Sequence, residues 1–308
     1  MKITKWERLI LYPLIVALMV VFIFFDLPIM QSLYDTRNVF GRMGELGGEI
    51  PLQLLGVICG FWLFRFRDTS SKSRSLWWGV LFIVIAIFFA GYGGGQVYSY
   101  LKVQKYSTYD FHPGIWFALP IAALYLGVGA LIAFKTKISH PEEAIVFAWF
   151  MIILYFATLL SMNVLKFFWA RPRWRFLVSE YGVDEAAQHF QAWYLWGFRW
   201  KFSDSYASFP SGHTMNALCW IVLAGASAFI DKLKGKEWII RIIVYVWAAL
   251  VALSRTIMGA HFSSDTTAGF FFELLLFDLL GTFFFPWFHD KVLAKLGQNE
   301  KPLKTATN

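Results

Sequence analysis

Long apolar segments follow one another along most of the chain and leave little polar sequence between them. A helix that crosses a membrane needs about 20 predominantly apolar residues, because the lipid core offers its backbone no hydrogen-bond partners. Eight runs approach this length, and the second is the shortest. They are 9–25, 50–64, 76–98, 114–134, 144–169, 214–230, 238–258 and 266–288. The sequence therefore predicts an all-α, polytopic transmembrane helical bundle of about eight spans.

The composition supports a membrane protein and excludes an ordinary soluble domain. Hydrophobic residues make up 58% of the chain and charged residues 16%, whereas soluble domains have about 45–50% and about 25%. The formal net charge is +8. Because the basic residues lie in short connections between apolar runs, they indicate membrane topology rather than nucleic-acid binding. Cys59 and Cys219 lie within apolar runs, so we interpret them as small buried hydrophobic residues rather than disulfide or metal ligands.

The distribution of Lys and Arg predicts the orientation of the spans. With the N-terminus in the cytoplasm, the cytoplasmic segments carry 17 Lys and Arg residues and the longer outer segments carry nine. The positive-inside rule then predicts that both termini are cytoplasmic. No small-residue cleavage pattern follows the first apolar run. We therefore expect this run to be a retained span rather than a cleaved signal peptide.

Two outer segments differ from simple connections. The segment 26–49 is too interrupted by glycine and arginine for a span, but it has room for a short interfacial helix. The segment 174–200 holds nine aromatic residues, which suit either an interfacial anchor or a lid that grips a lipid. These are Trp174, Phe176, Tyr181, Phe190, Trp193, Tyr194, Trp196, Phe198 and Trp200.

Three polar clusters fall on the outer side of the membrane in this orientation. The first lies where the fifth run ends, the second lies just before the sixth, and the third links the seventh and eighth. They are Lys166 with Arg171, Pro172 and Arg173; Pro210 with Ser211, Gly212 and His213; and Ser254 with Arg255, His261 and Asp265.

Some residues from all three clusters are suited to binding a phosphate group. Lys166, Arg173 and Arg255 offer cations, and a guanidinium donates in a planar, bidentate geometry that matches phosphoryl oxygens. Ser211 and Gly212 open a predicted helix, whose backbone N–H groups and dipole attract an anion. Glycine lets the backbone approach that anion closely, and the Ser211 hydroxyl adds a donor.

The remaining side chains suit nucleophilic catalysis. Of the two histidines, His213 and His261, one can attack the phosphorus atom while the other handles the proton. Asp265 follows His261 by four residues and can hold that imidazole in one tautomer, which leaves the other nitrogen as nucleophile. The sequence has no array of carboxylates, cysteines and further histidines for a metal. We expect neither a metal nor another cofactor.

Together, the three clusters resemble the motifs of the type 2 phosphatidic acid phosphatase (PAP2) superfamily, which includes vanadium haloperoxidases and glucose-6-phosphatase. The family pattern is Lys, six residues, Arg-Pro; then Pro-Ser-Gly-His; then Ser-Arg, five residues, His, three residues, Asp. Lys166 and Arg173 have the family spacing, although Trp174 replaces the expected proline. Arg171-Pro172 is too close to Lys166 to fit. The second and third motifs match at every defining position.

The resemblance implies a role for each residue. His261 is the expected nucleophile that forms a phosphohistidine, and Asp265 is its partner. His213 is the expected acid that protonates the leaving oxygen, and then the base that activates water. The expected phosphate cradle is Lys166, Arg173, Ser211, Gly212 and Arg255.

The resemblance also implies a domain organisation. The family core has six spans, so we expect two additional spans to precede Lys166. We divide the chain into N-terminal transmembrane spans (1–135), a PAP2-like catalytic core (136–290) and a polar cytoplasmic tail (291–308).

The implied function is metal-independent removal of phosphate from a lipid phosphate or diphosphate in the bilayer. Substrates of the family include phosphatidic acid, phosphatidylglycerol phosphate and undecaprenyl diphosphate, of which the last is our first expectation for a bacterial inner membrane, with the active site extracytoplasmic. Two alternatives stay open. A phosphotransferase would pass the phosphoryl group from His261 to another lipid. A non-catalytic lipid transporter is disfavoured because both histidines and Asp265 are present.

Several other polar residues receive structural interpretations. His189 and Asp184 match no motif, so we expect them at the surface. Arg171 and Arg175 are interpreted as charges that flank the first motif. Within the eighth run, Asp278 lies toward the cytoplasmic end, where we expect it to pair with Arg241. The role of Glu273 is left open between structure and function.

Overall fold

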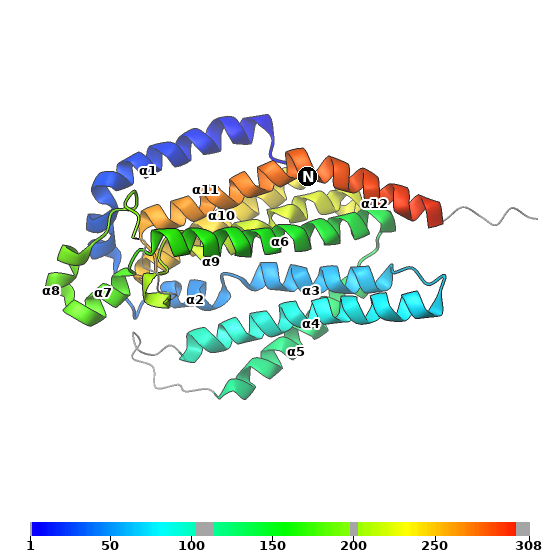
Figure 1. Cartoon of the computed structure of the whole chain (residues 1–308), viewed down its shortest axis with the longest axis horizontal. Coiled ribbons are helices and arrows are strands. Elements are labelled where there is room, and N and C mark those ends of the chain that lie inside the picture. Colours follow the sequence, from blue (N-terminus) through cyan, green and yellow to red (C-terminus); the bar gives the residue numbers. More distant parts are fainter. Residues whose placement is uncertain (1, 103–113, 198–202, 300–308) are drawn as a thin grey trace, which may run out of the picture.

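The computed structural model describes residues 2–102, 114–197 and 203–299, and helices are its only regular secondary structure in these ranges. The long helices lie side by side in a bundle (Figure 1). They are α1 (Lys5–Leu33), α3 (Ile50–Arg65), α4 (Lys72–Lys102), α5 (Ala118–Lys135), α6 (Pro141–Trp169), α10 (Glu237–Ile257), α11 (Ser263–Leu279) and α12 (Phe285–Asn299). The shorter ones include α2 (Val39–Gly47), α7 (Trp174–Tyr181), α8 (Val183–Ala186) and α9 (Gly212–Cys219).

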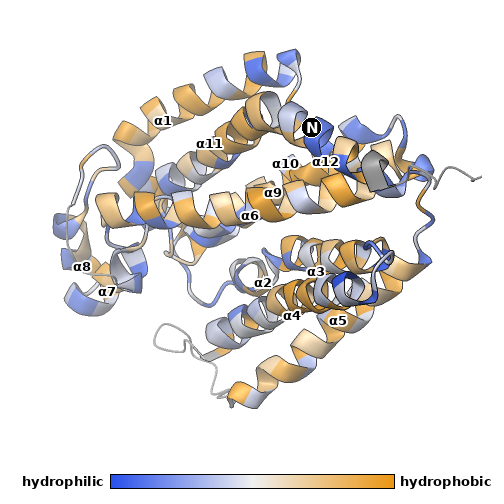
Figure 2. Ribbon diagram, turned by 45° about the vertical axis from the view of Figure 1, so that its right-hand side comes forward, coloured by the Kyte–Doolittle hydropathy of each residue, from blue (hydrophilic) through white to orange (hydrophobic). Residues whose placement is uncertain are grey.

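Seven helical segments in the described ranges are long and apolar enough to cross a membrane. Figure 2 shows hydrophobic residues along the long helices, whereas hydrophilic residues gather in α7, α8 and at helix ends. Two predicted features lie outside the described residues, namely the aromatic side chains of Phe198 and Trp200 and the end of the tail, 300–308. The protein is thus a polytopic helical bundle.

The sixth predicted run takes a different form from the others. It consists of the eight-residue α9 and a nine-residue 3₁₀ helix, Trp220–Ala228. A 3₁₀ helix rises by about 2.0 Å per residue and an α-helix by about 1.5 Å, so the two together extend about 30 Å. This length matches the lipid core even though the α-helix itself is short.

The short helix expected within 26–49 forms as α2, but it is not a free interfacial helix. Its glycines face α10, where a Cβ on Gly44 would collide with the Ser254 side chain and one on Gly48 would lie 3.1 Å from Val251. Small residues allow two membrane helices to pack closely. The glycines that made this segment look irregular are therefore its packing surface.

Ion pairs tie the helices together at the end of the bundle that holds α12 and the N-terminus (Figure 1). The expected pair of Asp278 with Arg241 is wrong. Asp278 accepts hydrogen bonds from Arg8 at 2.6 and 2.8 Å, and Arg241 donates to Glu7 at 3.1 Å. The reason is that α1 packs beside α11, which brings Arg8 close to Asp278.

Three other expectations can be compared with the structure. Glu273 accepts a hydrogen bond of 2.8 Å from the hydroxyl of Thr158 and is buried inside the bundle. This contact gives it a structural partner. The polar tail was expected to begin at residue 291, but α12 continues to Asn299. His189 and Asp184 are exposed, as expected.

The helices α3, α4 and α5 pack on one another through glycine. A Cβ on Gly56 would lie 2.3 Å from ring atoms of Phe89, which is fully buried. We predict that Gly56→Ala lowers the free energy of unfolding by about 1–3 kcal/mol, the usual range for an overpacked core. The apparent Tm in detergent measures this change.

Gly91, on α4, supplies the matched control. Its added Cβ would have no described atom within 4 Å, and alanine is better than glycine in a helix by about 1 kcal/mol. Gly91→Ala should therefore leave Tm unchanged or raise it. Equal Tm shifts for the two variants would contradict the proposed α3–α4 packing.

Candidate active site

The three predicted motifs meet at the end of the bundle formed by α7 and α8, opposite to α12 (Figure 1). Helix α6 ends there because Ala170 adopts a left-handed conformation, with φ of 42°, and Pro172 cannot continue the helix. This turn leaves Lys166 in the last turn of α6 and directs 171–173 into the site. The starts of α9 and α11 and the end of α10 supply the other residues.

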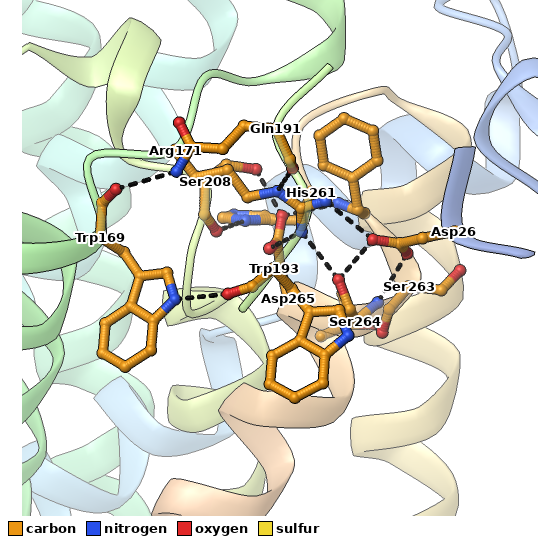
Figure 3. Close-up of polar contacts among 12 residues, drawn as sticks. Asp26, Trp169, Arg171, Gln191, Trp193, Ser208, His261, Ser263, Ser264 and Asp265 are labelled. Carbon is orange, nitrogen blue, oxygen red and sulfur yellow. Dashed lines mark hydrogen bonds and ion pairs between the residues drawn. The ribbon is translucent and has the colours of Figure 1, made fainter. Parts of the chain in front are cut away.

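His261 is held so that one ring nitrogen remains available. Its Nδ1 lies 2.5 Å from the backbone carbonyl oxygen of Ser208, as Figure 3 shows. A carbonyl only accepts, so Nδ1 carries the hydrogen and Nε2 keeps its lone pair when the ring is neutral. Arg173 places Nη1 3.3 Å from that Nε2. A predicted phosphate ligand therefore lies beside the nitrogen that is predicted to be the nucleophile.

Asp265 acts on this histidine indirectly, which differs from the expected direct contact. Its Oδ2 accepts from the Ser208 hydroxyl at 2.5 Å and from the Phe262 N–H at 2.8 Å. Asp265 occupies the first turn of α11, where a carboxylate caps the helix. Ser208 is thus the link, because its hydroxyl bonds Asp265 while its carbonyl bonds His261.

Arg171 was interpreted as a flanking charge, and this was wrong. It is fully buried, with Nη1 2.6 Å from Asp265 and Nη2 2.8 Å from Asp26 of α1. Asp26 also accepts hydrogen bonds from the backbone and side chain of Ser264. Figure 3 shows the guanidinium between the two carboxylates. Arg171 therefore positions Asp265 rather than substrate.

Ser211 and Gly212, which are predicted to bind an anion, lie at the start of α9. Ser211 caps the helix and accepts from the N–H of Thr214 at 3.4 Å. A Cβ on Gly212 would lie 2.4 Å from Sδ of Met162 and 3.3 Å from Nζ of Lys166. The cation of Lys166 thus lies close to the backbone of Gly212, where a side chain would displace Met162 and where glycine leaves room for an anion to approach.

Arg255 is buried beside a carboxylate that the motifs did not reveal. Its Nη1 lies 3.0 Å from Oε1 of Glu45 on α2. Glu45 also pairs with Arg42 at 2.6 Å and with Arg175 at 2.9 Å. Arg175 is therefore not a simple flanking charge. Its partner comes from the segment between the first two spans, so no local sequence pattern could have indicated it.

His213 faces the same segment of the chain. Its Nε2 lies 3.3 Å from the backbone oxygen of Glu45, and its Nδ1 lies 3.7 Å from Oε1 of Glu49. The ring of Tyr100 packs edge-on against the imidazole, with 5.0 Å between the centroids. The acid–base candidate therefore contacts α2, α3 and α4 as well as its own helix.

The site concentrates positive charge, and this affects its titration. Burial, followed by the charges of Arg173, Arg255 and Lys166, lowers the pKa of His261 well below 6.5. Arg173 lowers the pKa of Asp204, which accepts from that guanidinium at 2.7 Å. The imidazole is consequently neutral at pH 7, which is the form that can attack phosphorus.

A metal would need several grouped ligands. No three His, Cys, Asp or Glu side chains in the described ranges are grouped in this way. The polar groups that converge on the site are instead cations and N–H donors, which suit an anion.

Comparison with known proteins finds a similarity in the second half of the chain. The family model of the PAP2 superfamily matches residues 145–288. We call this range the PAP2 segment. Phosphatidylglycerophosphatase B of Bacillus subtilis (strain 168) is 42% identical over 84 residues, which cover 26% of this chain and 40% of that relative. The alignment thus spans less than half of the relative. No solved structure gives a significant match.

The PAP2 segment does not contain every residue of the site. Asp26, Glu45 and Glu49 all precede it, and each is buried against one of its basic residues or against His213. An intramembrane acid is a signal that sequence can give, and Asp26 lies at the end of the first apolar run. Its partner Arg171 could not be assigned without the tertiary structure.

The aromatic segment contacts Trp169 at the end of α6, and Trp169 in turn packs next to the second motif. Trp169 stacks on Phe209, with 4.6 Å between the centroids, and its indole N–H donates to the carbonyl of Trp193 at 2.6 Å. Trp169 also packs on the exposed Trp196. These contacts are compatible with both interpretations of the aromatic segment, as an anchor at the membrane interface and as a lid that grips a lipid.

We predict that Arg171→Leu strongly destabilises the protein, because it leaves two buried carboxylates without their cation. Breaking a buried pair in this way costs about 3–5 kcal/mol. Adding Asp26→Asn to Arg171→Leu removes one of the unpaired charges and should recover part of the loss. The measurement is the apparent Tm in detergent for both variants. A double variant no more stable than Arg171→Leu would contradict the bridging role.

Proposed function

We propose that the protein is a metal-independent membrane phosphatase that hydrolyses a lipid phosphate or diphosphate through a phosphohistidine on His261. The observation that carries this proposal is the pairing of the free Nε2 of His261 with Arg173 at 3.3 Å. A nucleophilic nitrogen and a phosphate ligand are thus adjacent at one end of a membrane bundle.

The proposed reaction has two steps. Nε2 of His261 attacks phosphorus, and the P–O bond to the lipid breaks while His213 gives a proton to the leaving oxygen. Water then attacks the phosphohistidine, His213 takes a proton from that water, and the N–P bond breaks to release phosphate. Lys166, Arg173 and Arg255 stabilise the charge on the phosphoryl oxygens in both steps.

The substrate and the orientation follow from the membrane setting. The name of the Bacillus subtilis relative supports a phosphatidylglycerol phosphate-like substrate, and undecaprenyl diphosphate and phosphatidic acid also present a terminal phosphoryl group. The site lies at the end of the bundle opposite to α12 and the N-terminus. The excess of Lys and Arg at that opposite end favours an extracytoplasmic site.

The first test is phosphate release by purified protein in detergent with EDTA. The substrates are phosphatidylglycerol phosphate, undecaprenyl diphosphate, phosphatidic acid and glucose 6-phosphate. We expect release from at least one lipid, and His261→Ala should reduce it by at least a thousandfold, because the nucleophile is lost. An acid-labile phosphoenzyme should form in the wild type alone.

Three outcomes would count against this proposal. Wild-type rates in His261→Ala would exclude the assigned nucleophile, and strong inhibition by EDTA would indicate a metal. A phosphoenzyme that transfers its phosphoryl group to a lipid but not to water would make the protein a phosphotransferase.

The ionisation of His261 gives a prediction that needs no substrate. Burial and nearby cations hold the pKa of this imidazole well below 6.5, so the ring should be neutral at pH 6.5, with hydrogen on Nδ1. Spectra of ¹⁵N-histidine-labelled protein measure both properties, and His261→Gln assigns the signal. A ring that is half-protonated at pH 6.5 or above would contradict the prediction.

A further inference from the structure

Glu49 lies against the proposed acid–base residue without an evident structural reason. It is the residue before α3 begins, and its Oε1 is 3.7 Å from Nδ1 of His213. The two side chains are only 10% and 6% exposed. Within the described part of the chain, Oε2 of Glu49 is buried and makes no hydrogen bond. Asn216, Lys166 and Arg255 also interact with this carboxylate, but a buried oxygen without a hydrogen bond is costly, which calls for a function.

The neighbouring carboxylate cannot take the same role. Glu45 lies one turn earlier and is occupied by Arg42, Arg175 and Arg255. Glu45 therefore balances the cations, and its backbone oxygen receives the other nitrogen of His213. This division leaves Glu49 as the carboxylate that faces the ring of His213.

The two ring nitrogens of His213 thus both face oxygen. The carbonyl of Glu45 accepts, so Nε2 carries a hydrogen. On the other side, Nδ1 and Oε1 of Glu49 are 3.7 Å apart, which is longer than a hydrogen bond but close enough for an ion pair, so a proton on either group is stabilised by the other. Whether this proton resides on the ring or on the carboxyl group, the pair keeps one proton in the site.

We propose that Glu49 is the positioning residue of His213 and shares this proton with it. The inference rests on the proposed phosphatase function. When the lipid oxygen leaves, Nε2–H of His213 gives its proton to that oxygen, and the proton shared with Glu49 moves fully onto Nδ1. When water attacks the phosphohistidine, Nε2 takes a proton back and the Nδ1 proton returns to its shared position.

The charges around His213 explain why such a partner is needed. Burial, followed by the charges of Arg255, Lys166 and Arg173, acts against a positive charge on this imidazole. Glu45 acts in the opposite direction, but it is already paired with three guanidinium groups. The ring of Tyr100, packed against the imidazole, adds no formal charge at neutral pH. Without Glu49, no proton could move onto Nδ1 when Nε2–H gives its proton to the leaving oxygen, so His213 would be a weaker acid.

The test is Glu49→Gln, which keeps the shape of the side chain but removes its charge. A lipid phosphate has an alkoxide leaving group that needs a proton, whereas p-nitrophenyl phosphate has a stable one. We expect kcat to fall at least tenfold on the lipid phosphate and less than threefold on p-nitrophenyl phosphate. Equal losses on the two substrates, or no loss, would overturn the proposal.

Glu7→Gln is the matched control. Glu7 is also largely buried, pairs with Arg241 at 3.1 Å and lies at the opposite end of the bundle. This variant should leave the ratio of the two kcat values unchanged. A ratio that changes as much as in Glu49→Gln would show a general effect of removing a buried carboxylate and would overturn the assigned role.

A spectroscopic test separates this inference from the proposed function. In ¹⁵N-histidine-labelled wild type at pH 7, Nδ1 of His213 should resonate toward the protonated range, and it should move to the unprotonated range in Glu49→Gln. His213→Gln assigns the signal. Identical Nδ1 shifts in the two proteins would overturn the role of Glu49 even if the wild type is an active phosphatase. A wild type without phosphatase activity would contradict the proposed function. The Nδ1 chemical shift of His213 would still show whether His213 and Glu49 share a proton.

Discussion

The buried ion triad of Asp26, Arg171 and Asp265 connects the membrane bundle to the catalytic residues. Arg171 contacts one carboxylate from α1 and one from α11, at 2.8 and 2.6 Å. Its charge cannot be left unpaired in a fully buried position, so the two helices must remain at this spacing. Asp265 then fixes Ser208, and the carbonyl of Ser208 fixes the nucleophilic histidine. The position of His261 thus depends on a helix outside the PAP2 segment.

A second constraint is the balance of charge at the phosphate site. Lys166, Arg173 and Arg255 lie together near His261, where we propose that they bind phosphate, and without counter-charges these three cations would repel one another. Glu45 offsets this repulsion by contacting Arg255 and Arg175. An arriving phosphate can share Arg255 with Glu45, so the guanidinium is already oriented before the substrate binds.

Close packing by glycine allows α2 and the residues that follow it to bring two acidic side chains into the site. Gly44 and Gly48 let this helix lie directly on α10, and Glu45 and Glu49 then reach Arg255 and His213. The N-terminal part of the chain consequently does more than add spans to a catalytic core. It supplies the counter-charges of the site, and it supplies Glu49 for the further inference drawn above.

The sequence by itself determined the class of the protein and most of the residues that meet in the site. Apolar runs of membrane length require helices, and the three motifs place two histidines, an aspartate and three cations at ends of such helices. The spacing of a motif fixes which residues share a turn, and this is local information. Only the tertiary structure decided the partners. Arg171 pairs with Asp26 across 145 positions of the chain, and Asp278 pairs with Arg8 rather than Arg241. Such pairs depend on which helices pack side by side, and charge and hydropathy patterns within one helix do not encode that choice.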